Sequence, residues 1–323
     1  MTRNATNKLL QKAKRLKSDE FYTQLPDIDR ELQHYESHFK GKVVYCNCDD
    51  PRNSNFFKYF ATNFHRLCLK KLIASCYKKQ NNDLFDTGEK ENGSYFEYTG
   101  EELDSKAIEV TYFNGDGDFR SIESIHLLKQ SDIVVTNPPF SLFREYVAQL
   151  IKYDKKFLII GNINAITYKE IFQLIKENKV WLGINLGRGI SGFIVPSHYE
   201  LYGTETRINQ FGDRIISPNN CLWLTNLETP QRHEEIKLTK KYFGYESKYQ
   251  KYDNYDGINV NRTQDIPMDY AGYMGVPITF LHKFNPDQFE IIKFRKGNDG
   301  KDLSIGGRCP YFRILIKNKQ IAP

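Results

Sequence analysis

The sequence predicts an α/β protein with a doubly wound, mostly parallel sheet and a smaller C-terminal region. From about residue 41, short β-rich runs alternate with helical segments, and this alternation is typical of a parallel sheet with helices on both faces. After about Thr229 the alternation stops, and a stretch dense in Tyr, Lys and Asn follows. We therefore expect a first domain over residues 1–228 and a smaller region over residues 229–323.

The elements follow in order from the N-terminus. Residues 1–20 predict a basic helical arm, and helical periodicity begins after Pro26. Seven strands are predicted from their apolar, β-branched runs, at residues 41–50, 69–77, 108–121, 131–140, 155–166, 180–187 and 221–227. Helices are predicted between them at residues 51–67, 124–130, 141–153 and 167–178. Residues 78–105 are polar and predict a loop or a surface hairpin.

Composition narrows the class of protein. The 323 residues carry a net charge of +6, which weakly favours a polyanionic partner. No apolar run approaches the roughly 18–20 residues that span a membrane, and the polar N-terminus lacks the apolar centre of a secretory signal, so we expect a cytoplasmic protein. Six scattered cysteines favour reduced thiols, and the Cys46–Cys48 pair favours a buried strand over a zinc site, since no second pair has ligand spacing.

One motif carries chemistry. Asn137-Pro138-Pro139-Phe140 follows the fourth predicted strand. Methylating an aromatic amine requires two acceptors that hold its N–H groups and aim its lone pair at an electrophilic methyl. The side-chain oxygen of Asn137 and the carbonyl of Pro138 suit these roles, because proline restricts the backbone, and the Phe140 ring can stack on a flat base. The alternative is a proline turn that only closes the strand.

Several motifs together resemble the EcoRI modification methylase family of adenine-N6 DNA methyltransferases. They are DEFYT (19–23), YCNCDDPRNSNFFKYF (45–60), FNGDGDFRS (113–121), DIVVTNPPFSLF (132–143), WLGINLGRGISGFIVP (181–196) and MGVPITFLHKFNPDQFE (274–290). The resemblance covers nearly the whole chain. It implies methyl transfer from S-adenosylmethionine to N6 of an adenine in double-stranded DNA, at the second adenine of GAATTC, after the base leaves the stack. It also implies the protective role in a restriction–modification pair.

The resemblance assigns roles to particular residues. Asn137, Pro138, Pro139 and Phe140 correspond to the catalytic motif. The cofactor-binding candidates are Phe21, Tyr22, Thr23, Asp49, Asp50, Asp118 and Phe119. Among them, Thr23 would meet the methionine carboxylate, and Asp118 would accept from the cofactor's adenine amine. The candidates for contact with DNA are Arg188, Lys240, Lys241 and Lys248, and no metal is expected.

The sequence departs from the wider family after the first strand. A glycine-rich FxGxG turn is replaced by CNCDDPR, and the second strand ends in LIASCYKK without an acid for the ribose. Asp49 and Asp50 can bind the cofactor, or one of them only caps the following helix. GDGDFR lacks the phosphate-loop and calcium-loop patterns. The alternative to a cofactor-binding role for this segment is a tight turn at a strand end. The loop around Arg188 is a target-base element or a surface turn, and the Lys/Tyr-rich stretch is a DNA surface or a solvated loop.

Two other functions stay open from the sequence. A methyltransferase with the same motif can act on an amide in protein or a base in RNA, and a degenerate chain of this kind can bind DNA without catalysis. We expect a monomer without an obligatory protein partner, because a methylase can modify one strand of a palindrome per visit.

Overall fold

The computed structural model describes residues 22–77, 92–101, 108–185, 190–195, 206–210, 212–216, 220–295, 303–310 and 312–321. The predicted basic arm, Phe21 and Arg188 lie outside these residues. The chain divides into two compact units. Unit 1 comprises residues 1–165 and 183–227, and unit 2 comprises residues 166–182 and 228–323. Residues 166–182, which we predicted within the first domain, therefore belong to the second compact unit.

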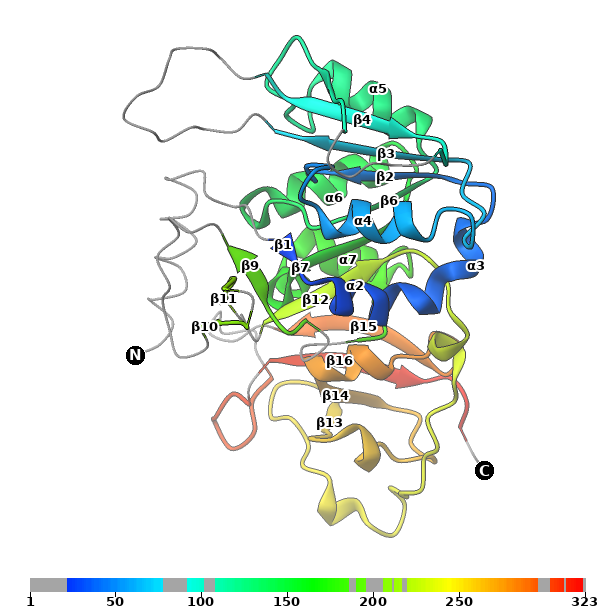
Figure 1. The fold of residues 1–323 in the computed structure, drawn as a ribbon. Coiled ribbons are helices and arrows are strands. Elements are labelled where there is room, and N and C mark those ends of the chain that lie inside the picture. The colour runs from blue at the N-terminus through cyan, green and yellow to red at the C-terminus, as the bar shows by residue number, and fades with distance from the viewer. Residues whose placement is uncertain are drawn as a thin grey trace. The chain divides into compact units, whose positions relative to one another are not determined.

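Unit 1 contains a mixed sheet with a parallel centre. Its parallel strands, in spatial order, are β3 (Lys71–Cys76), β2 (Val43–Asn47), β6 (Ile133–Thr136) and β7 (Lys156–Asn162). Antiparallel strands extend both edges: β4 (Ser94–Tyr98) and β5 (Thr111–Tyr112) beside β3, and β12 (Cys221–Thr225) beside β7. These strands form a mixed α/β sheet that is parallel at its centre and antiparallel toward its edges (Figure 1).

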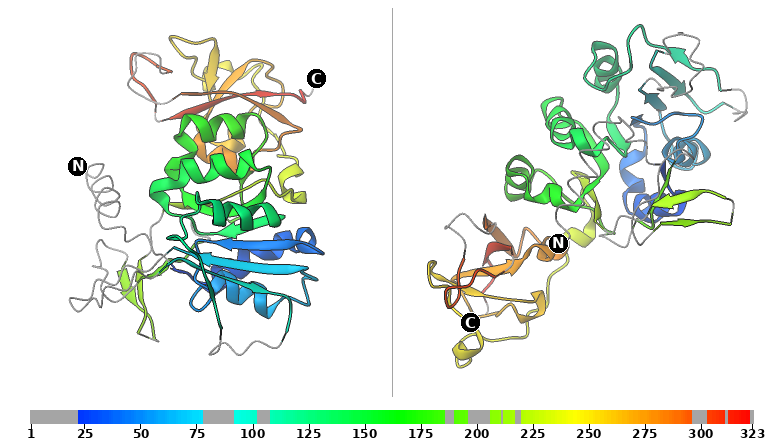
Figure 2. Two further views of the ribbon diagram at one scale, coloured as in Figure 1. Left: turned by 90° about the horizontal axis from the view of Figure 1, so that it is seen from above. Right: turned by 90° about the vertical axis from the view of Figure 1, so that its left-hand side faces the viewer.

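Helices lie on both faces of this sheet (Figure 2). On one face lie α2 (Leu25–Leu32), the 3₁₀ turn η1 (Gln33–Tyr35), α3 (Glu36–Phe39) and α4 (Asn55–Thr62). On the other lie α5 (Ile122–Gln130) and α6 (Phe143–Lys152). The side chain of Ser54 caps α4 by accepting hydrogen bonds from the amides of Phe56 and Phe57, and Ser121 caps α5. Helices α4 and α6 lie within the ranges predicted from the sequence, and α5 begins two residues before its predicted start at residue 124.

Successive side chains of each central strand point to opposite faces of the sheet, as the period of two in a β-strand requires. Val44 and Cys46 of β2 belong to the core that packs against α2 and α4. Tyr45, between them, is fully buried and shares a hydrogen bond of 2.7 Å with Ser75 of β3. Both faces of β2 are therefore covered, which is why this strand reads as a continuous apolar run.

Two strand predictions need correction, and the region predicted as a loop or a surface hairpin contains a strand. The stretch predicted as a loop or surface hairpin contains β4, which pairs antiparallel with β3. The predicted strand at 108–121 is reduced to the two residues of β5, because β4 occupies the position beside β3. Of the described residues 180–185 in the strand predicted at 180–187, only Trp181–Leu182 form a strand, β8. Polar residues around a short strand weaken its alternation, so the pattern did not separate β4 from its loop.

A second small sheet in unit 1 joins the N-terminal end of the described chain to later residues. Its order is β1 (Tyr22–Thr23), β9 (Phe193–Val195), β11 (Arg214–Ile216) and β10 (Thr206–Ile208), with every pairing antiparallel. Thr23 pairs with Phe193. The sheet thus places Thr23 beside residues that are about 170 positions away in the chain.

Unit 2 is built on its own four-stranded sheet. The order is β13 (Gly257–Asn259), β14 (Tyr273–Pro277), β16 (Arg313–Asn318) and β15 (Phe289–Arg295), and only the first pair is parallel. Helix α7 (Lys169–Lys176) packs on β15, with the rings of Phe172 and Phe294 centred 5.1 Å apart. The 3₁₀ turns are η4 (Pro230–His233), η5 (Glu246–Lys248), η6 (Thr263–Asp265) and η7 (Ile278–Lys283), while η3 (Ile163–Thr167) spans the boundary of the units.

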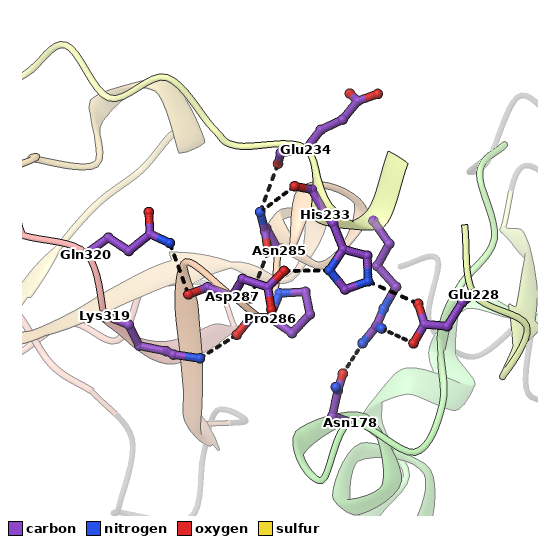
Figure 3. Close-up of polar contacts among 10 residues, drawn as sticks. Asn178, Glu228, His233, Glu234, Asn285, Pro286, Asp287, Lys319 and Gln320 are labelled. Carbon is purple, nitrogen blue, oxygen red and sulfur yellow. Dashed lines mark hydrogen bonds and ion pairs between the residues drawn. The ribbon is translucent and has the colours of Figure 1, made fainter. Parts of the chain in front are cut away.

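A polar network ties the two chain segments of unit 2 together (Figure 3). The Arg232 guanidinium lies 3.7 Å from the centre of the Trp181 ring and donates to Glu228 and to the side-chain oxygen of Asn178. His233 contacts Asp287 at 2.5 Å and Glu228 at 3.3 Å. The network anchors residues 178–181 to η4, which explains why that segment belongs to unit 2 rather than to the unit that precedes it in the chain.

Three further classes of feature can be stated for the described residues. No helix among them is long and apolar enough to cross a membrane. No group of three or more His, Cys, Asp or Glu side chains in that part of the chain can hold a metal ion. All six cysteines are free thiols, and Cys46 and Cys221 are buried.

Candidate functional site

The parallel strands of unit 1 end at one edge of the sheet, and the order β3-β2-β6-β7 reverses direction between β2 and β6. In open α/β sheets, ligands bind outside the carboxyl ends of the strands at such a reversal. Residues Asn47–Asp50 leave β2 at this point, and Asn137 leaves β6. Two of the motifs singled out in the sequence therefore meet at the place where the topology favours a ligand.

The Asn137–Phe140 motif follows β6 directly. Asn137 is half-buried, and its side-chain oxygen is covered by protein. Pro138 is buried, and Phe140 opens the 3₁₀ turn η2 (Phe140–Leu142). The Phe140 ring is half-buried and meets the Phe193 ring edge to face, with centres 6.2 Å apart. Because Phe193 pairs with Thr23, the motif lies close to the short strand β1.

Asp49 connects the ends of β2 and β6. Its side chain is buried, with 9% exposed. One oxygen accepts a hydrogen bond of 2.8 Å from Ser54, and the other contacts the hydroxyl of Thr136, which also contacts the carbonyl of Asn47. Burial raises the pKa of Asp49 to about 7, and the nearby charge of Asp50 acts in the same direction.

Asp50 stabilises the turn that leads into α4. Its carboxylate accepts from the backbone N–H of Arg52 at 3.1 Å and from the side chain of Asn53 at 3.0 Å. The helix cap itself is Ser54. The cap of this helix is therefore Ser54 and not an aspartate. Asp49 supports the cap by accepting a hydrogen bond from the Ser54 hydroxyl.

Thr23 is buried, with 3% exposed, and its carbonyl accepts a 2.8 Å hydrogen bond from the side chain of Asn55 in α4. Its hydroxyl is also buried, and none of the described residues lies within hydrogen-bonding distance of it. A buried hydroxyl without a partner costs free energy, so the hydroxyl is suited to a polar group of a ligand.

Asp118 follows a tight crossing of two loops. Gly117 has φ +75°, and a Cβ there would lie 2.5 Å from the carbonyl oxygen of Cys76, at the end of β3. Arg120 grips the Asp118 carboxylate through two nitrogens, at 2.9 and 2.7 Å, and these hydrogen bonds hold the pKa of Asp118 below its usual range. Burial raises the pKa of the Cys48 thiol well above its usual range, and the charges of Asp49 and Asp118 act in the same direction.

Phe119 points into the helical layer. It is buried, and its ring meets that of Tyr146 in α6 edge to face, with centres 5.0 Å apart. Its carbonyl accepts a 2.9 Å hydrogen bond from Gln149. These contacts fix the segment that carries Asp118 against α6.

Helix α2 holds both sides of the predicted target-base loop with two buried carboxylates. Glu31 accepts from the amides of Ile184 and Asn185, at 2.8 and 2.9 Å, and from the Asn185 side chain and the Tyr35 hydroxyl. Asp27, one turn earlier, accepts from the amide and hydroxyl of Ser191, at 2.7 and 2.8 Å. The segments on either side of residues 186–189 are therefore attached to α2.

The structure brings some predicted residues together and leaves others apart. Tyr22, Thr23, Asp49, Asp50, Asp118, Phe119 and the Asn137–Phe140 motif all belong to unit 1. Lys240, Lys241 and Lys248 belong to unit 2 and are exposed, and the Lys248 ammonium lies 4.6 Å from the centre of the Tyr245 ring. Sequence reasoning missed Ser54, Thr136, Arg120 and the carboxylates of α2. Of these, only Ser54 carried a signal, as a serine before an apolar helical run.

Comparison with known proteins places the chain in a family. The family model described as the adenine-specific methyltransferase EcoRI matches residues 9–319. The chain is 71% identical over 324 residues to the Type II methyltransferase M.EcoRI of Escherichia coli, with 99% of each chain covered. It is 38% identical over 329 residues to the Type II methyltransferase M.MgeORF184P of Mycoplasma genitalium, and 38% identical over 327 residues to M.MpnI of Mycoplasma pneumoniae. Each of these two alignments covers 96% of this chain and 98% of the relative.

No solved structure matches the chain. The family model and the first relative each cover nearly all of it, and they confirm the resemblance that the motifs indicated. The chain belongs to the EcoRI family of adenine-specific methyltransferases.

Proposed function

We propose that this adenine-specific methyltransferase transfers a methyl group from S-adenosylmethionine to N6 of the second adenine of GAATTC in double-stranded DNA. The observation that carries the proposal is the position of Asn137 at the reversal of strand order, between Thr136, which contacts Asp49, and the Phe140 motif residue, whose ring packs on Phe193. The Type II relatives support a role as the protective partner of a restriction endonuclease. We further propose a monomer that acts in the cytoplasm.

In the proposed mechanism, the adenine leaves the duplex and enters the site beside η2. The side-chain oxygen of Asn137 and the carbonyl of Pro138 accept from the two N–H groups of the amine, and Phe140 stacks on the base. Pro139 keeps Pro138 extended, so the two acceptors stay fixed relative to each other. This grip turns the N–H bonds out of the ring plane, which weakens the conjugation of the nitrogen lone pair with the ring and leaves it free to attack an electrophilic methyl group. The methylated nitrogen then releases a proton to solvent.

S-adenosylmethionine supplies the electrophilic methyl group. Residues of unit 1 fit this group: the buried Thr23 hydroxyl, which has no partner among the described residues, suits the methionine carboxylate. Asp118, held ionised by Arg120, suits the adenine amine. Asp50, Tyr22 and Phe119 complete the proposed cofactor site, together with Phe21, which lies outside the described residues. Cys48 takes φ 71°, the left-handed conformation typical of glycine, at the position of the missing glycine-rich turn.

We propose that unit 2 and Arg188 contact the DNA. Lys240, Lys241 and Lys248 are exposed and lie in a stretch that alternates lysines with tyrosines, which favours contact with phosphates. Three exposed lysines add electrostatic attraction that does not depend on sequence, and the net charge of +6 acts in the same direction.

The test is methylation of defined duplexes by the purified protein with radiolabelled S-adenosylmethionine. We expect label in a GAATTC duplex, and no label in a duplex whose second adenines already carry N6-methyl groups. Plasmid from expressing cells should resist an endonuclease that cuts GAATTC. Transfer to RNA or protein instead of DNA would overturn the proposal, and so would DNA binding without any transfer.

A further inference from the structure

Asp49 has a specific set of contacts at the meeting point of β2 and β6. Its Oδ1 accepts from the Ser54 hydroxyl at 2.8 Å, and its Oδ2 contacts the Thr136 hydroxyl. The same Thr136 oxygen contacts the backbone carbonyl of Asn47. Thr136 is fully buried and directly precedes Asn137.

The number of protons in this network is limited. The Thr136 hydroxyl has one proton but faces two acceptors, the Asn47 carbonyl and Asp49. If that proton lies on the Asn47 carbonyl, the contact between Thr136 and Asp49 requires a proton on the carboxyl. Ser54 cannot provide it, because its one proton points to the other Asp49 oxygen while its lone pairs accept from the amides of Phe56 and Phe57.

We propose that Asp49 is a neutral carboxylic acid that positions Thr136, and through it Asn137, rather than a ligand of the cofactor. A directional chain of hydrogen bonds then runs from the first turn of α4 through Ser54, Asp49 and Thr136 to the end of β2. Because the chain ends one residue before Asn137, it fixes the direction in which the Asn137 backbone leaves β6. The inference rests on the proposed function for its catalytic consequence, while the protonation state stands on the contacts alone.

The surroundings of Asp49 favour the neutral form. The side chain is buried, and in the described part of the chain the titratable groups that interact with it are acids: Asp50 and Cys48 in the loop after β2, Cys46 in β2 and Tyr146 in α6. Burial penalises a negative charge on Asp49, and the charge of Asp50 repels it. Burial accordingly raises the pKa of Asp49 to about 7.

The key variant is Asp49→Asn, because an amide reproduces a neutral acid. The Asn nitrogen can donate to Thr136 and the Asn oxygen can accept from Ser54. At about pH 6, where Asp49 is protonated, we expect Asp49→Asn to methylate DNA in a single turnover within about threefold of the parent rate, with an unchanged KM for S-adenosylmethionine. Asp49→Ala and Thr136→Val should each slow the single turnover by about tenfold to a hundredfold, because small misplacements of a reacting group are costly, while KM changes less than about threefold.

Two results would overturn the proposal. In one, Asp49→Asn is as slow as Asp49→Ala, which would mean that the ionised carboxylate is required. In the other, Asp49→Asn raises the KM for S-adenosylmethionine about tenfold while Thr136→Val is unaffected, which would make Asp49 a cofactor ligand. Asp132→Asn, at the other end of β6 and exposed, is the charge-matched control and should behave like the parent protein.

A spectroscopic measurement separates this inference from the proposed function. Infrared difference spectra at about pH 6 should contain a protonated-carboxyl band that is absent from Asp49→Asn and retained in Asp132→Asn, since ordinary carboxyls ionise near pH 4. Absence of that difference would overturn the neutral acid even if the enzyme is active. If the parent protein transfers no methyl group to DNA, RNA or protein, the proposed function fails, and the spectra still decide the protonation of Asp49.

Discussion

At the scale of single residues, the site depends on which polar atoms are buried by the surrounding protein. The side-chain oxygen of Asn137 is covered, and the residue as a whole is half-buried at the end of β6. Partial burial limits the freedom that the amide can lose when a base binds, which lowers the entropic cost of the proposed grip.

Replacing Asn137 tests the proposed grip on the adenine amine. We expect Asn137→Ala to lower the single-turnover rate by at least about a hundredfold, because one of two acceptors is lost. Cofactor and DNA affinities, measured by calorimetry and fluorescence anisotropy, should stay within about threefold. Asn137→Asp keeps an acceptor oxygen and should lose less activity. Equal activity of Asn137→Ala and the parent protein would exclude the proposed role.

At the scale of elements, the loop that carries Asp118 is built around one close backbone approach. Gly117 is buried with φ +75°, and a Cβ there would lie 2.5 Å from the Cys76 carbonyl oxygen. Gly93 faces it from the start of the β4 segment, and its own Cβ would lie 2.4 Å from the Gly117 Cα. The two glycines let the loop cross over the end of β3, which brings Asp118 to the edge where the strands end.

We expect Gly117→Ala to reduce the free energy of unfolding by about 3 kcal/mol, from the left-handed backbone and the clash with the Cys76 carbonyl. Urea denaturation measures the change. Gly115→Ala is the control, because a Cβ there would meet only the end of the Glu123 side chain, at 3.4 Å, and the backbone is not left-handed. That variant should differ from the parent by less than about 0.5 kcal/mol. Equal losses from the two substitutions would contradict the proposed crossing.

The attachment of α2 to residues 184–185 depends on one carboxylate. Glu31 is fully buried and accepts from four donors, so an amide in its place would turn N–H groups toward N–H groups. We expect Glu31→Gln to cost about 3 kcal/mol of unfolding free energy. The control Glu36→Gln removes an exposed ion pair with Arg66 and should cost less than about 1 kcal/mol. A loss in Glu31→Gln no larger than in the control would show that these hydrogen bonds contribute little.

At the scale of the whole molecule, each unit has its own source of stability. In unit 2, hydrogen bonds to Asp287 and Glu228 raise the pKa of His233. Protonated His233 therefore stabilises the folded state fully below its unfolded pKa of about 6.5, and this contribution is lost as the pH rises through the higher folded value. Because the side chain is 44% exposed, the effect should stay under about 1 kcal/mol.

We expect the melting temperature of the parent protein to fall more between pH 6 and pH 8 than that of His233→Gln, since only the parent carries this ionisable group. Calorimetry at several pH values measures the difference. The Asp49→Asn variant provides an independent comparison, because it removes a titratable group from unit 1 instead of unit 2. Parallel pH profiles of the parent and His233→Gln would contradict the assigned ion pairs.

The charge of the molecule predicts how DNA binding responds to salt. Replacing Lys240, Lys241 and Lys248 with Gln should reduce the slope of log affinity against log salt by up to about 2.7, or about 0.9 for each lost phosphate contact. Anisotropy titrations at several salt concentrations measure this slope. The control variant carries Gln at the exposed Lys58, Lys129 and Lys152 of unit 1. It has the same net charge as the first triple variant. Equal slopes for the two triple variants would mean that the lysines of unit 2 are not the specific contacts.

The alternation of elements and the position of the Asn137–Phe140 motif could be predicted from the local sequence. Apolar periodicity and capping residues act over a few neighbouring positions, so helices α4, α5 and α6 and strands β2, β3, β6, β7 and β12 could be predicted from them. The motifs that contain Thr23, Asp118 and Asn137 could also be identified from the sequence, because each is a short run of unusual residues. The family followed from their combination.

Which distant residues contact one another became clear only from the folded chain. Strand β4 pairs with β3, residues 166–182 belong to unit 2, and Asp49 contacts Thr136 from 87 positions away. Such contacts depend on strand order and on which polar groups remain after the core has packed. Neither the strand order nor the set of remaining polar groups can be predicted from local sequence patterns. The protonation of a buried acid is decided in the same way, by the donors and acceptors that the fold brings around it.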